Sequence, residues 1–175
     1  MPQLVILTGP IAAGKNTVAD GLAQRLTGRG HTVVVADVDE VAAMVRAPGA
    51  AAAGLWFAAH EAHGALVGRW LRSNVDYVVV VGPFWTAEER ATLLAPVPDG
   101  VDTLWVVIDA PVSATFPRAL ADPGRALSRD PAFHQRAHDR FRKWLPSIPA
   151  DQTFDSEELS ADQIAAAIAE TLGVG

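Results

Sequence analysis

The stretch that decides the fold lies near the start of the chain, where residues 4–17 read Leu-Val-Ile-Leu-Thr-Gly-Pro-Ile-Ala-Ala-Gly-Lys-Asn-Thr. An apolar run leads into Gly9-x-x-x-x-Gly14-Lys15, which is the spacing of a Walker A phosphate loop. Glycines let the backbone fold closely around phosphate oxygens, so that successive N–H groups point inward. Lys15 adds a positive charge, and the helix predicted to follow presents its N-terminus to the same anion. The stretch therefore predicts a strand, a phosphate-binding loop and a helix in succession.

One position departs from the usual loop. The residue after the lysine is normally Ser or Thr, whose hydroxyl ligates Mg²⁺, whereas here it is Asn16, followed by Thr17. An Asn carbonyl oxygen also binds hard cations, so an altered magnesium site is expected, and its strength stays open. The residues expected to hold ATP here are Gly9, Ile11, Ala12, Ala13, Gly14, Lys15, Asn16 and Thr17.

Bulk composition limits the class of protein. With 175 residues, half of them hydrophobic, the chain is expected to form one domain with an ample core. The absence of cysteine excludes disulfides, thiolate zinc sites and cysteine nucleophiles. A net charge of −6 disfavours a general nucleic-acid binder. No apolar run long enough to span a bilayer and no secretory leader are visible, so a cytoplasmic protein without a membrane partner is expected.

Strand-like runs alternate with helical runs, which is typical of an α/β fold with a parallel sheet. Strands are predicted at 3–8, 32–36, 77–81, 103–108 and 152–154, and helices at 15–28, 39–47, 50–72, 86–95, 112–121, 131–144 and 160–172. Right-handed crossovers place the carboxyl ends of all strands along one edge. The loops expected at this edge are 9–16, 37–39, 82–85 and 109–111.

Two carboxylates follow the second predicted strand, Asp37 and Asp39. In extended chain, residues two apart point the same way, here toward the phosphate loop. One carboxylate would hold Mg²⁺ while the other accepts a proton from a substrate hydroxyl. The alternative is that Asp39 only caps the helix that begins at Glu40.

The loop after the third strand, Gly82-Pro-Phe-Trp85, carries no acid. Gly82 would let the backbone approach a substrate, and Phe84 and Trp85 would wall its pocket. Plain core packing of these aromatic residues is an equal alternative.

Two further side chains are candidates for binding the acceptor. His60, three residues before His63 on a predicted helix, would line the acceptor pocket, or both would face solvent. Arg46, expected at the end of the helix that follows Asp39, would pair with an anionic acceptor.

Basic residues concentrate between Val112 and Trp144, which hold six arginines and Lys143. Phosphoryl transfer spreads negative charge over three oxygens, and a mobile lid of arginines neutralises it. Arg125 and Arg129, four apart, are the preferred lid residues, with Arg118 as the third. A solvated helix face with internal Asp–Arg pairs is the alternative.

Together these motifs resemble the small P-loop kinases of the shikimate kinase, gluconate kinase and chloramphenicol phosphotransferase group. The resemblance rests on the phosphate loop, on Asp37-Val-Asp39, on the stretch from Val107 that leads to the three arginines, and on residues 153–160. It implies a single three-layer domain over residues 1–175, with a five-stranded, mostly parallel sheet in the order 2-3-1-4-5 and a lid at about 112–131. It also implies that Asp37 supports Mg²⁺, that Asp39 binds the acceptor hydroxyl, and that the loop with Asp155 borders adenine. The bulky Gly82–Trp85 turn differs from the glycine-rich turn of shikimate kinases, which argues against shikimate as the acceptor.

The expected function is an ATP-dependent phosphotransferase acting on the hydroxyl of a small molecule. Its catalytic residues would be Lys15, Asp37, Asp39, Arg125 and Arg129. A nucleotide-binding regulator, or a degenerate kinase without turnover, is the alternative that Asn16 supports. A nucleic-acid end kinase is disfavoured by the acidic charge, since neutralising phosphates supplies most of that affinity. Monomer and homodimer both stay open.

Overall fold

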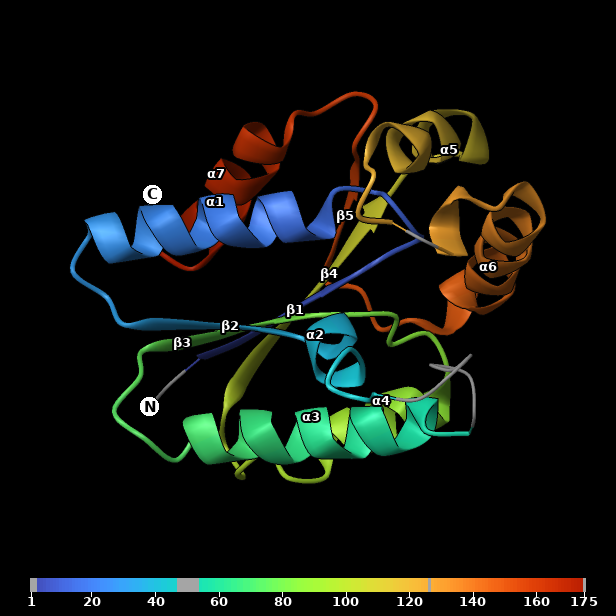
Figure 1. Ribbon diagram of the computed structural model, residues 1–175. Helices are drawn as coiled ribbons and strands as arrows, with labels where there is room; N and C mark the ends of the chain where they lie inside the picture. Colours follow the sequence, from blue (N-terminus) through green and yellow to red (C-terminus); the bar gives the residue numbers. More distant parts are fainter. Residues whose placement is uncertain (1–2, 47–53, 126, 175) are drawn as a thin grey trace.

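The apolar run before the phosphate loop forms the central strand of a five-stranded parallel sheet (Figure 1). The computed structural model describes residues 3–46, 54–125 and 127–174. The strands are β1 (Gln3–Thr8), β2 (Val33–Asp37), β3 (Tyr77–Val81), β4 (Asp102–Asp109) and β5 (Gln152–Asp155). Their order is β2-β3-β1-β4-β5, so the predicted topology is confirmed.

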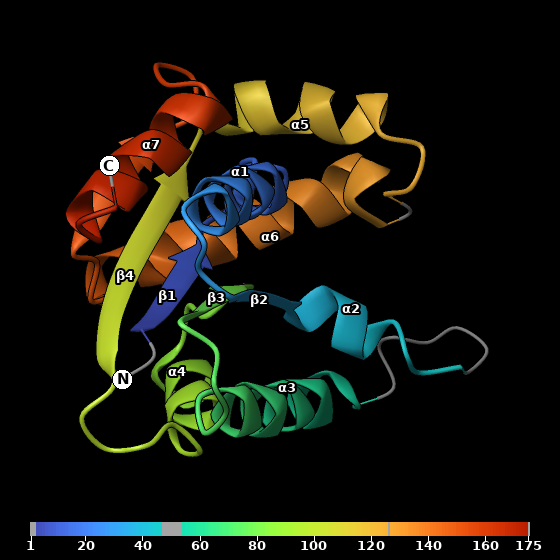
Figure 2. The same cartoon turned by 90° about the vertical axis from the view of Figure 1, so that its left-hand side faces the viewer.

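Helices cover both faces of the sheet, which explains why the inner strands are continuous apolar runs. Leu22 of α1 (Lys15–Gly28) and Ile164 of α7 (Ala161–Thr171) pack on one face. Val67 of α3 (Trp56–Trp70) and Leu93 of α4 (Ala87–Leu94) pack on the other, together with α2 (Val38–Ala42). Figure 2 shows the two helical layers with the sheet between them. Within the described ranges, no helix is both long and apolar enough to cross a membrane.

Beyond the carboxyl edge of β4, the chain forms α5 (Val112–Ala121), the 3₁₀ turn η1 (Leu127–Arg129) and α6 (Pro131–Trp144), and a second 3₁₀ turn, η2 (Leu145–Ser147), precedes β5. The predicted bounds of α5 and α6 agree with the structure. Phe141 of α6 packs on Trp85 and on Val107 of β4, which attaches the arginine-rich segment to the sheet.

Two helices are shorter than expected. The helix predicted at 39–47 is only Val38–Ala42, because Asp37 ends β2 and caps α2, accepting a hydrogen bond from the backbone N–H of Asp39 at 2.8 Å. The helix predicted at 50–72 begins at Trp56, and residues 50–53 of that prediction lie outside the described residues.

Close packing of α3 against α4 depends on two glycines one turn apart. A Cβ added to Gly64 would lie 2.7 Å from the carbonyl oxygen of Thr92, and one added to Gly68 would lie 2.5 Å from the carbonyl oxygen of Pro96. Both distances are too short for a methyl group, so each glycine sets how closely the two helices approach. This packing fixes how the C-terminal half of α3 lies against the C-terminal end of α4.

We predict that Gly68→Ala lowers the free energy of unfolding by about 1–3 kcal/mol, because the new methyl group overpacks a rigid contact with backbone. The control is Gly28→Ala at the exposed end of α1, where an added Cβ meets nothing within 4 Å. Better helix propensity makes that change neutral or stabilising by less than about 1 kcal/mol. Denaturant unfolding monitored by circular dichroism measures both. Equal midpoints for Gly68→Ala and the wild type would contradict the prediction.

Candidate functional site

The phosphate loop has an unusual backbone path over residues 9–14. Gly9, Ala12 and Gly14 have φ angles of 153°, 56° and 94°. A Cβ at Gly9 would lie 2.0 Å from the carbonyl oxygen of Ile108, so only glycine lets the loop lie against β4. Backbone that alternates between right- and left-handed conformations forms a concave site whose N–H groups suit an anion. The loop then ends at the N-terminus of α1, as the sequence predicted.

Lys15 folds back over this loop. Its ammonium donates hydrogen bonds to the carbonyl oxygens of Gly9, at 3.2 Å, and of Pro10, at 2.7 Å. Burial lowers the pKa of Lys15 from its ordinary 10.5 to about 8, against the opposing effect of the nearby Asp39 and Asp37 carboxylates. Arg125 is close enough to lower the same pKa further. The structure thus brings together four residues that were predicted from distant parts of the sequence.

Asp37 is buried and both of its carboxylate oxygens are used. Oδ1 accepts the N–H of Asp39, and Oδ2 accepts a hydrogen bond of 2.7 Å from the amide nitrogen of Asn16. The helix cap is therefore Asp37, and the alternative that assigned this role to Asp39 is wrong. The side chains of Asp37 and Asp39 also do not extend in parallel, since Asp39 lies in the first turn of α2.

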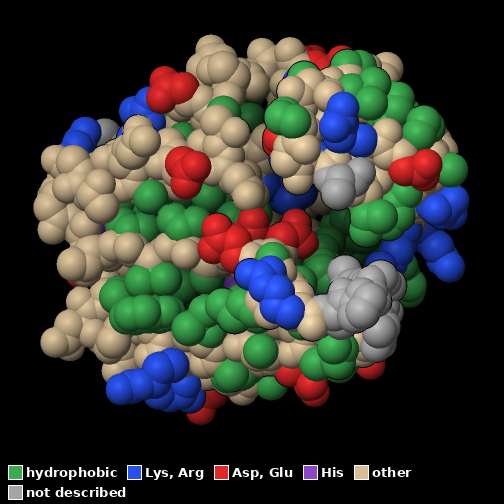
Figure 3. All heavy atoms as spheres, viewed as in Figure 1, with side chains coloured by type: hydrophobic (Ala, Val, Ile, Leu, Met, Phe, Trp, Pro, Cys, Tyr) green, Lys and Arg blue, Asp and Glu red, His purple; other side chains and the backbone are tan. Residues whose placement is uncertain are grey.

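The Asp39 carboxylate accepts no hydrogen bond from the residues that the structure describes. Partial burial of its carboxylate raises the pKa of Asp39 above its ordinary 3.8, and Asp37 raises it further, whereas Lys15 and Arg125 act in the opposite direction. Figure 3 shows acidic side chains gathered over α2, beside a hollow between the upper and lower helices. A carboxylate whose pKa is raised in such a place is suited to accepting a proton.

The residues present fit a magnesium ion bound mainly by phosphate and water. Mg²⁺ usually takes only one or two carboxylates from the protein, and within the described residues no group of three or more His, Cys, Asp or Glu side chains is arranged to hold a metal. Asp37 is the carboxylate nearest the loop residue Asn16. Asn16 directs its amide nitrogen at Asp37, so its role as a metal ligand stays a prediction.

The three arginines predicted for the lid have different surroundings. Arg125 donates from Nε to Asp122 at 3.0 Å, and the exposed Arg129 has no hydrogen bond or ion pair with any part of the chain that the structure describes. Arg118 donates to Ser156, at 2.9 Å to its hydroxyl and 2.8 Å to its carbonyl oxygen. Arg118 therefore joins α5 to the loop after β5.

Asp155, the residue predicted to border adenine, is the last residue of β5 and directly precedes this loop. Asp155 is exposed, and its carboxylate accepts the N–H of Glu157 at 2.8 Å. Thr17, the other residue expected to reach a phosphate, is exposed on the first turn of α1. The nucleotide-binding roles of both residues stay predictions.

Several residues predicted to contact the acceptor are instead structural. His60 and Phe84 are 1% and 0% exposed and stack edge to face in the core, so neither reaches a substrate and His60 does not face solvent. Gly82 has no room for an approaching ligand, because a Cβ there would lie 2.6 Å from Val38. Trp85 is also buried, and its indole N–H donates to the carbonyl oxygen of Gly9 at 3.3 Å.

Arg46 also departs from expectation. The helix ends at Ala42, and Arg46 lies beyond it, exposed, with its guanidinium on the carbonyl oxygen of Ala43 at 2.9 Å. Arg46 is therefore held by a contact with a residue only three positions earlier in the chain.

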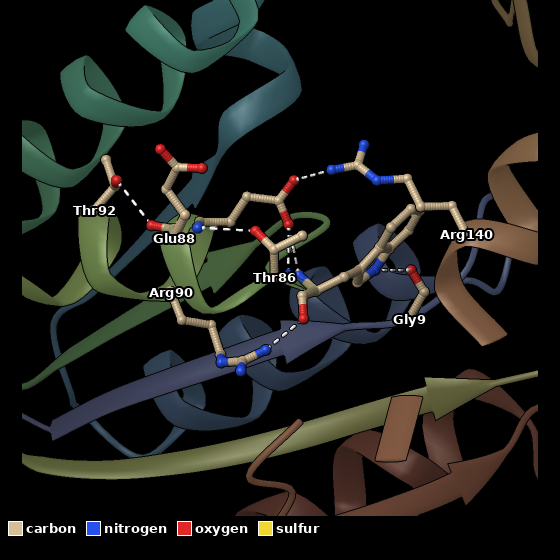
Figure 4. Close-up of polar contacts among 8 residues, drawn as sticks. Gly9, Thr86, Glu88, Arg90, Thr92 and Arg140 are labelled. Atoms are coloured by element: carbon tan, nitrogen blue, oxygen red, sulfur yellow. Dashed lines mark hydrogen bonds and ion pairs between the residues drawn. The ribbon is translucent and has the colours of Figure 1, made fainter. Parts of the chain in front are cut away.

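Sequence reasoning missed a pair that lies beside the loop after β3, Glu89 and Arg140. Arg140 Nη2 donates to Glu89 Oε1 at 2.6 Å, and Glu89 is buried (Figure 4). The pattern Thr86-x-x-Glu89 is a capping box and predicts the start of α4. Nothing in the sequence names the partner on α6, 51 residues later.

Comparison with known proteins agrees with this geometry. A family profile described as an AAA domain matches residues 4–148. No curated protein sequence matches the chain.

Among solved structures, the chain is similar to shikimate kinase from Acinetobacter baumannii, with 21% identity, a TM-score of 0.65 and coverage of 98% of this chain and 93% of that one. It is similar to the tunicamycin resistance protein of Deinococcus radiodurans, with 19% identity, a TM-score of 0.67 and coverage of 100% and 98%. It is also similar to an APS kinase from Mycobacterium tuberculosis in complex with AMPPNP and APS, with 18% identity, a TM-score of 0.64 and coverage of 98% of both chains. These likenesses establish the fold of the small P-loop kinases.

We predict that the Lys15 ammonium titrates near pH 8 in the ligand-free protein. The ¹³Cε and ¹⁵Nζ signals of lysine can be followed by NMR with little overlap, because Lys143 is the only other lysine. A Lys143→Arg variant assigns the two signals. Asp39→Asn should lower the midpoint for Lys15, because it removes a negative charge that favours the ammonium. A midpoint for Lys15 above pH 10 would contradict the burial on which this interpretation rests.

Proposed function

Because the chain belongs to the AAA domain family and has the fold of the small P-loop kinases, we propose that it transfers the γ-phosphoryl group of ATP to a hydroxyl of a small molecule. The observation that carries the proposal is the meeting of Lys15 with Asp37, Asp39 and Arg125 beside the phosphate loop. Lys15 and Arg125 would neutralise phosphate charge. Asp37 would support a metal ion, and Asp39 would accept a proton. A pure nucleotide-binding loop needs no such second carboxylate.

The nucleotide would replace the internal contacts of the loop. Lys15 now satisfies its ammonium on two carbonyl oxygens of the loop, and β- and γ-phosphate oxygens are stronger partners for it. Bound phosphate also stabilises the charged form, so ATP binding should raise the pKa of Lys15 and take up protons above pH 8. Magnesium at Asp37 would supply neutralisation of the phosphate charge.

In the transfer step, the acceptor oxygen forms a bond to the γ-phosphorus as the bond from that phosphorus to the bridging oxygen of ADP breaks. The hydroxyl proton passes to the Asp39 carboxylate, and ADP takes the electron pair of the broken bond. Arg125, between α5 and η1, and Arg129, at the end of η1, would neutralise the charge on the transferring group. For Arg125, this requires leaving its ion pair with the exposed Asp122, which costs little at the surface.

The test is Mg²⁺-dependent release of ADP from ATP in the presence of pooled alcohols, with Lys15→Ala as the control for nucleotide binding. We predict that Asp39→Asn lowers kcat by about 10²- to 10⁴-fold, because it removes the proton acceptor. Glu40→Gln is the matched control, since it changes the same charge on the next, exposed residue of α2, and it should stay within about threefold of the wild type.

The pH profile gives a second readout of Asp39. Its carboxylate must be ionised to accept a proton, so activity falls as the pH drops through its raised pKa, and the acid limb lies above the ordinary 3.8. Asp39→Asn should abolish that limb. Full activity in Asp39→Asn, with an unchanged profile, would exclude Asp39 as the base.

A second candidate function is a nucleotide-binding regulator without turnover, and the Asn16–Asp37 hydrogen bond favours it. That bond occupies the carboxylate oxygen that an active kinase offers to its metal shell. In a protein of this kind, ATP would bind and no alcohol would stimulate the release of ADP.

Variants at Asn16 separate the two functions. In an active kinase, Asn16→Ala should raise the Mg²⁺ concentration for half-maximal activity by about tenfold, because Asp37 loses the partner that orients it. Asn16→Ser, which restores a hydroxyl, should leave this concentration near or below that of the wild type. If the wild type is inactive with every alcohol and Asn16→Ser gains turnover, the regulator is the correct function.

A further inference from the structure

A groove of about 420 Å³ lies between the N-terminal ends of α3 and α4 and the C-terminal half of α6. Its walls are aromatic: Trp56 and Phe57 come from α3, and Trp144 comes from the last turn of α6. Thr86 and Ala87 lie at the start of α4. A volume of this size is ordinary for a small-molecule site.

The groove is next to the phosphate loop. The residue before Thr86 is Trp85, whose indole N–H donates to the carbonyl oxygen of Gly9. The same tryptophan lies under the guanidinium of Arg140, whose central carbon is 5.6 Å from the ring centre. The buried side chain of Trp85 therefore lies between the first glycine of the loop and the wall of the groove.

The positive charge of Arg140 in the groove is already paired with a carboxylate. Glu89 Oε2 accepts the backbone N–H groups of Trp85 and Thr86, at 2.9 and 2.8 Å, and Oε1 accepts from Arg140 at 2.6 Å. Figure 4 shows Arg140 reaching this carboxylate from α6, with Thr86 beneath it. Glu89 is only 4% exposed, so the pair is held on its acidic side by buried contacts.

No cation is left over for an anionic ligand. Among the described residues that line the groove, Arg140 is the only one that is basic, and Glu88 adds a second acid. The lining therefore has a net charge of −1 when both carboxylates and the guanidinium are ionised. A carboxylate brought here would have to compete with Glu89 for Arg140, whereas the exposed Glu88 would repel it only weakly through solvent.

The side chain behind the wall is neutral as well. His60 packs edge to face on Trp56, with ring centres 5.1 Å apart. Glu89 raises the pKa of His60 and Arg140 lowers it, although burial has the larger effect. Burial lowers the pKa of His60, so the ring is uncharged at neutral pH. Neither ring nitrogen has a hydrogen-bond partner within the described part of the chain.

We propose, on the premise that the protein is a kinase for alcohols, that this groove binds the acceptor and selects an uncharged alcohol with an aromatic or similarly flat apolar body. The aromatic walls supply the affinity, since each buried aromatic contact contributes both area and ring geometry. The Glu89–Arg140 pair discriminates against anionic ligands, because Arg140, the only basic residue among the described lining residues, is already paired with Glu89. Carboxylate-bearing alcohols, such as sugar acids, are rejected.

The experiment uses a matched pair of probes, 2-naphthalenemethanol and 6-(hydroxymethyl)-2-naphthoate, which differ by one carboxylate. Binding to the full-length protein with ADP and Mg²⁺ present is measured by isothermal titration and by saturation-transfer NMR, and phosphate transfer from ATP is measured by ³¹P NMR. We predict that the uncharged probe binds at least about tenfold more tightly. Phe57→Ser, at an exposed wall position, should weaken its binding about threefold or more.

Glu89→Gln tests the origin of the selectivity. Glutamine retains an oxygen for the N–H groups at the start of α4 but removes the charge that neutralises Arg140. The preference for the uncharged probe should fall about tenfold or reverse. Glu88→Gln removes the same charge from the neighbouring, exposed lining residue and should change the preference by less than about twofold.

Outcomes for the kinase and for the groove are distinguishable. If the uncharged probe binds with the predicted selectivity but no alcohol is phosphorylated, the proposed function fails and the groove keeps its ligand class. If the naphthoate binds equally well, or is phosphorylated faster, the inference is overturned while the kinase stands. Absence of binding of either probe, or equal effects of Glu89→Gln and Glu88→Gln, also overturns it.

Discussion

The candidate site is organised around a single buried carboxylate, that of Asp37. It ends β2, begins α2 through a capping hydrogen bond, and reaches α1 through Asn16. A cap of this kind stabilises a protein by about 1 kcal/mol, but the geometric consequence is larger than the energetic one. Because the carboxylate is held at both oxygens, the position of Asp39 relative to the phosphate loop follows from it. Burial lowers the pKa of Lys15 and raises that of Asp39, and the negative charge of Asp37 raises both.

Much of this was predictable from local sequence, and the reasons are physical. The continuous apolar runs identified strands buried on both faces, and the glycine spacing of residues 9–14 identified the loop, because few other residues tolerate its backbone. The helices predicted at 131–144 and 160–172 begin at Pro131 and Ala161, each after a side chain that caps it, Asp130 and Ser160. These signals depend only on neighbours along the chain.

What failed depended on contacts between distant segments. Asp37 and Asp39 look equivalent in the sequence, but Asp37 accepts hydrogen bonds from Asn16 of α1 and from the N–H of Asp39, whereas the Asp39 carboxylate accepts none from the described residues. His60 was expected to line the acceptor pocket or to face solvent, yet it is buried against Phe84 and Trp56. Likewise, the sequence named no acidic partner on another element for Arg140 or Arg142, which pair with Glu89 and Asp109 at 2.6 Å each. Composition shows the number of arginines but not their partners.

That distribution of arginines separates two electrostatic environments along one edge of the sheet. Beside the phosphate loop, burial lowers the pKa of Lys15 and Arg125 lowers it further, so an anion bound there would favour the charged ammonium. On the other side of Trp85, Arg140 of the groove is paired with the buried Glu89. A negatively charged acceptor would therefore be attracted to the phosphate loop, where we propose that the nucleotide binds, and not to the groove. An uncharged acceptor would bind in the groove without this competition. The charge pattern that would attract ATP to the loop would therefore also keep the binding sites of the two substrates separate.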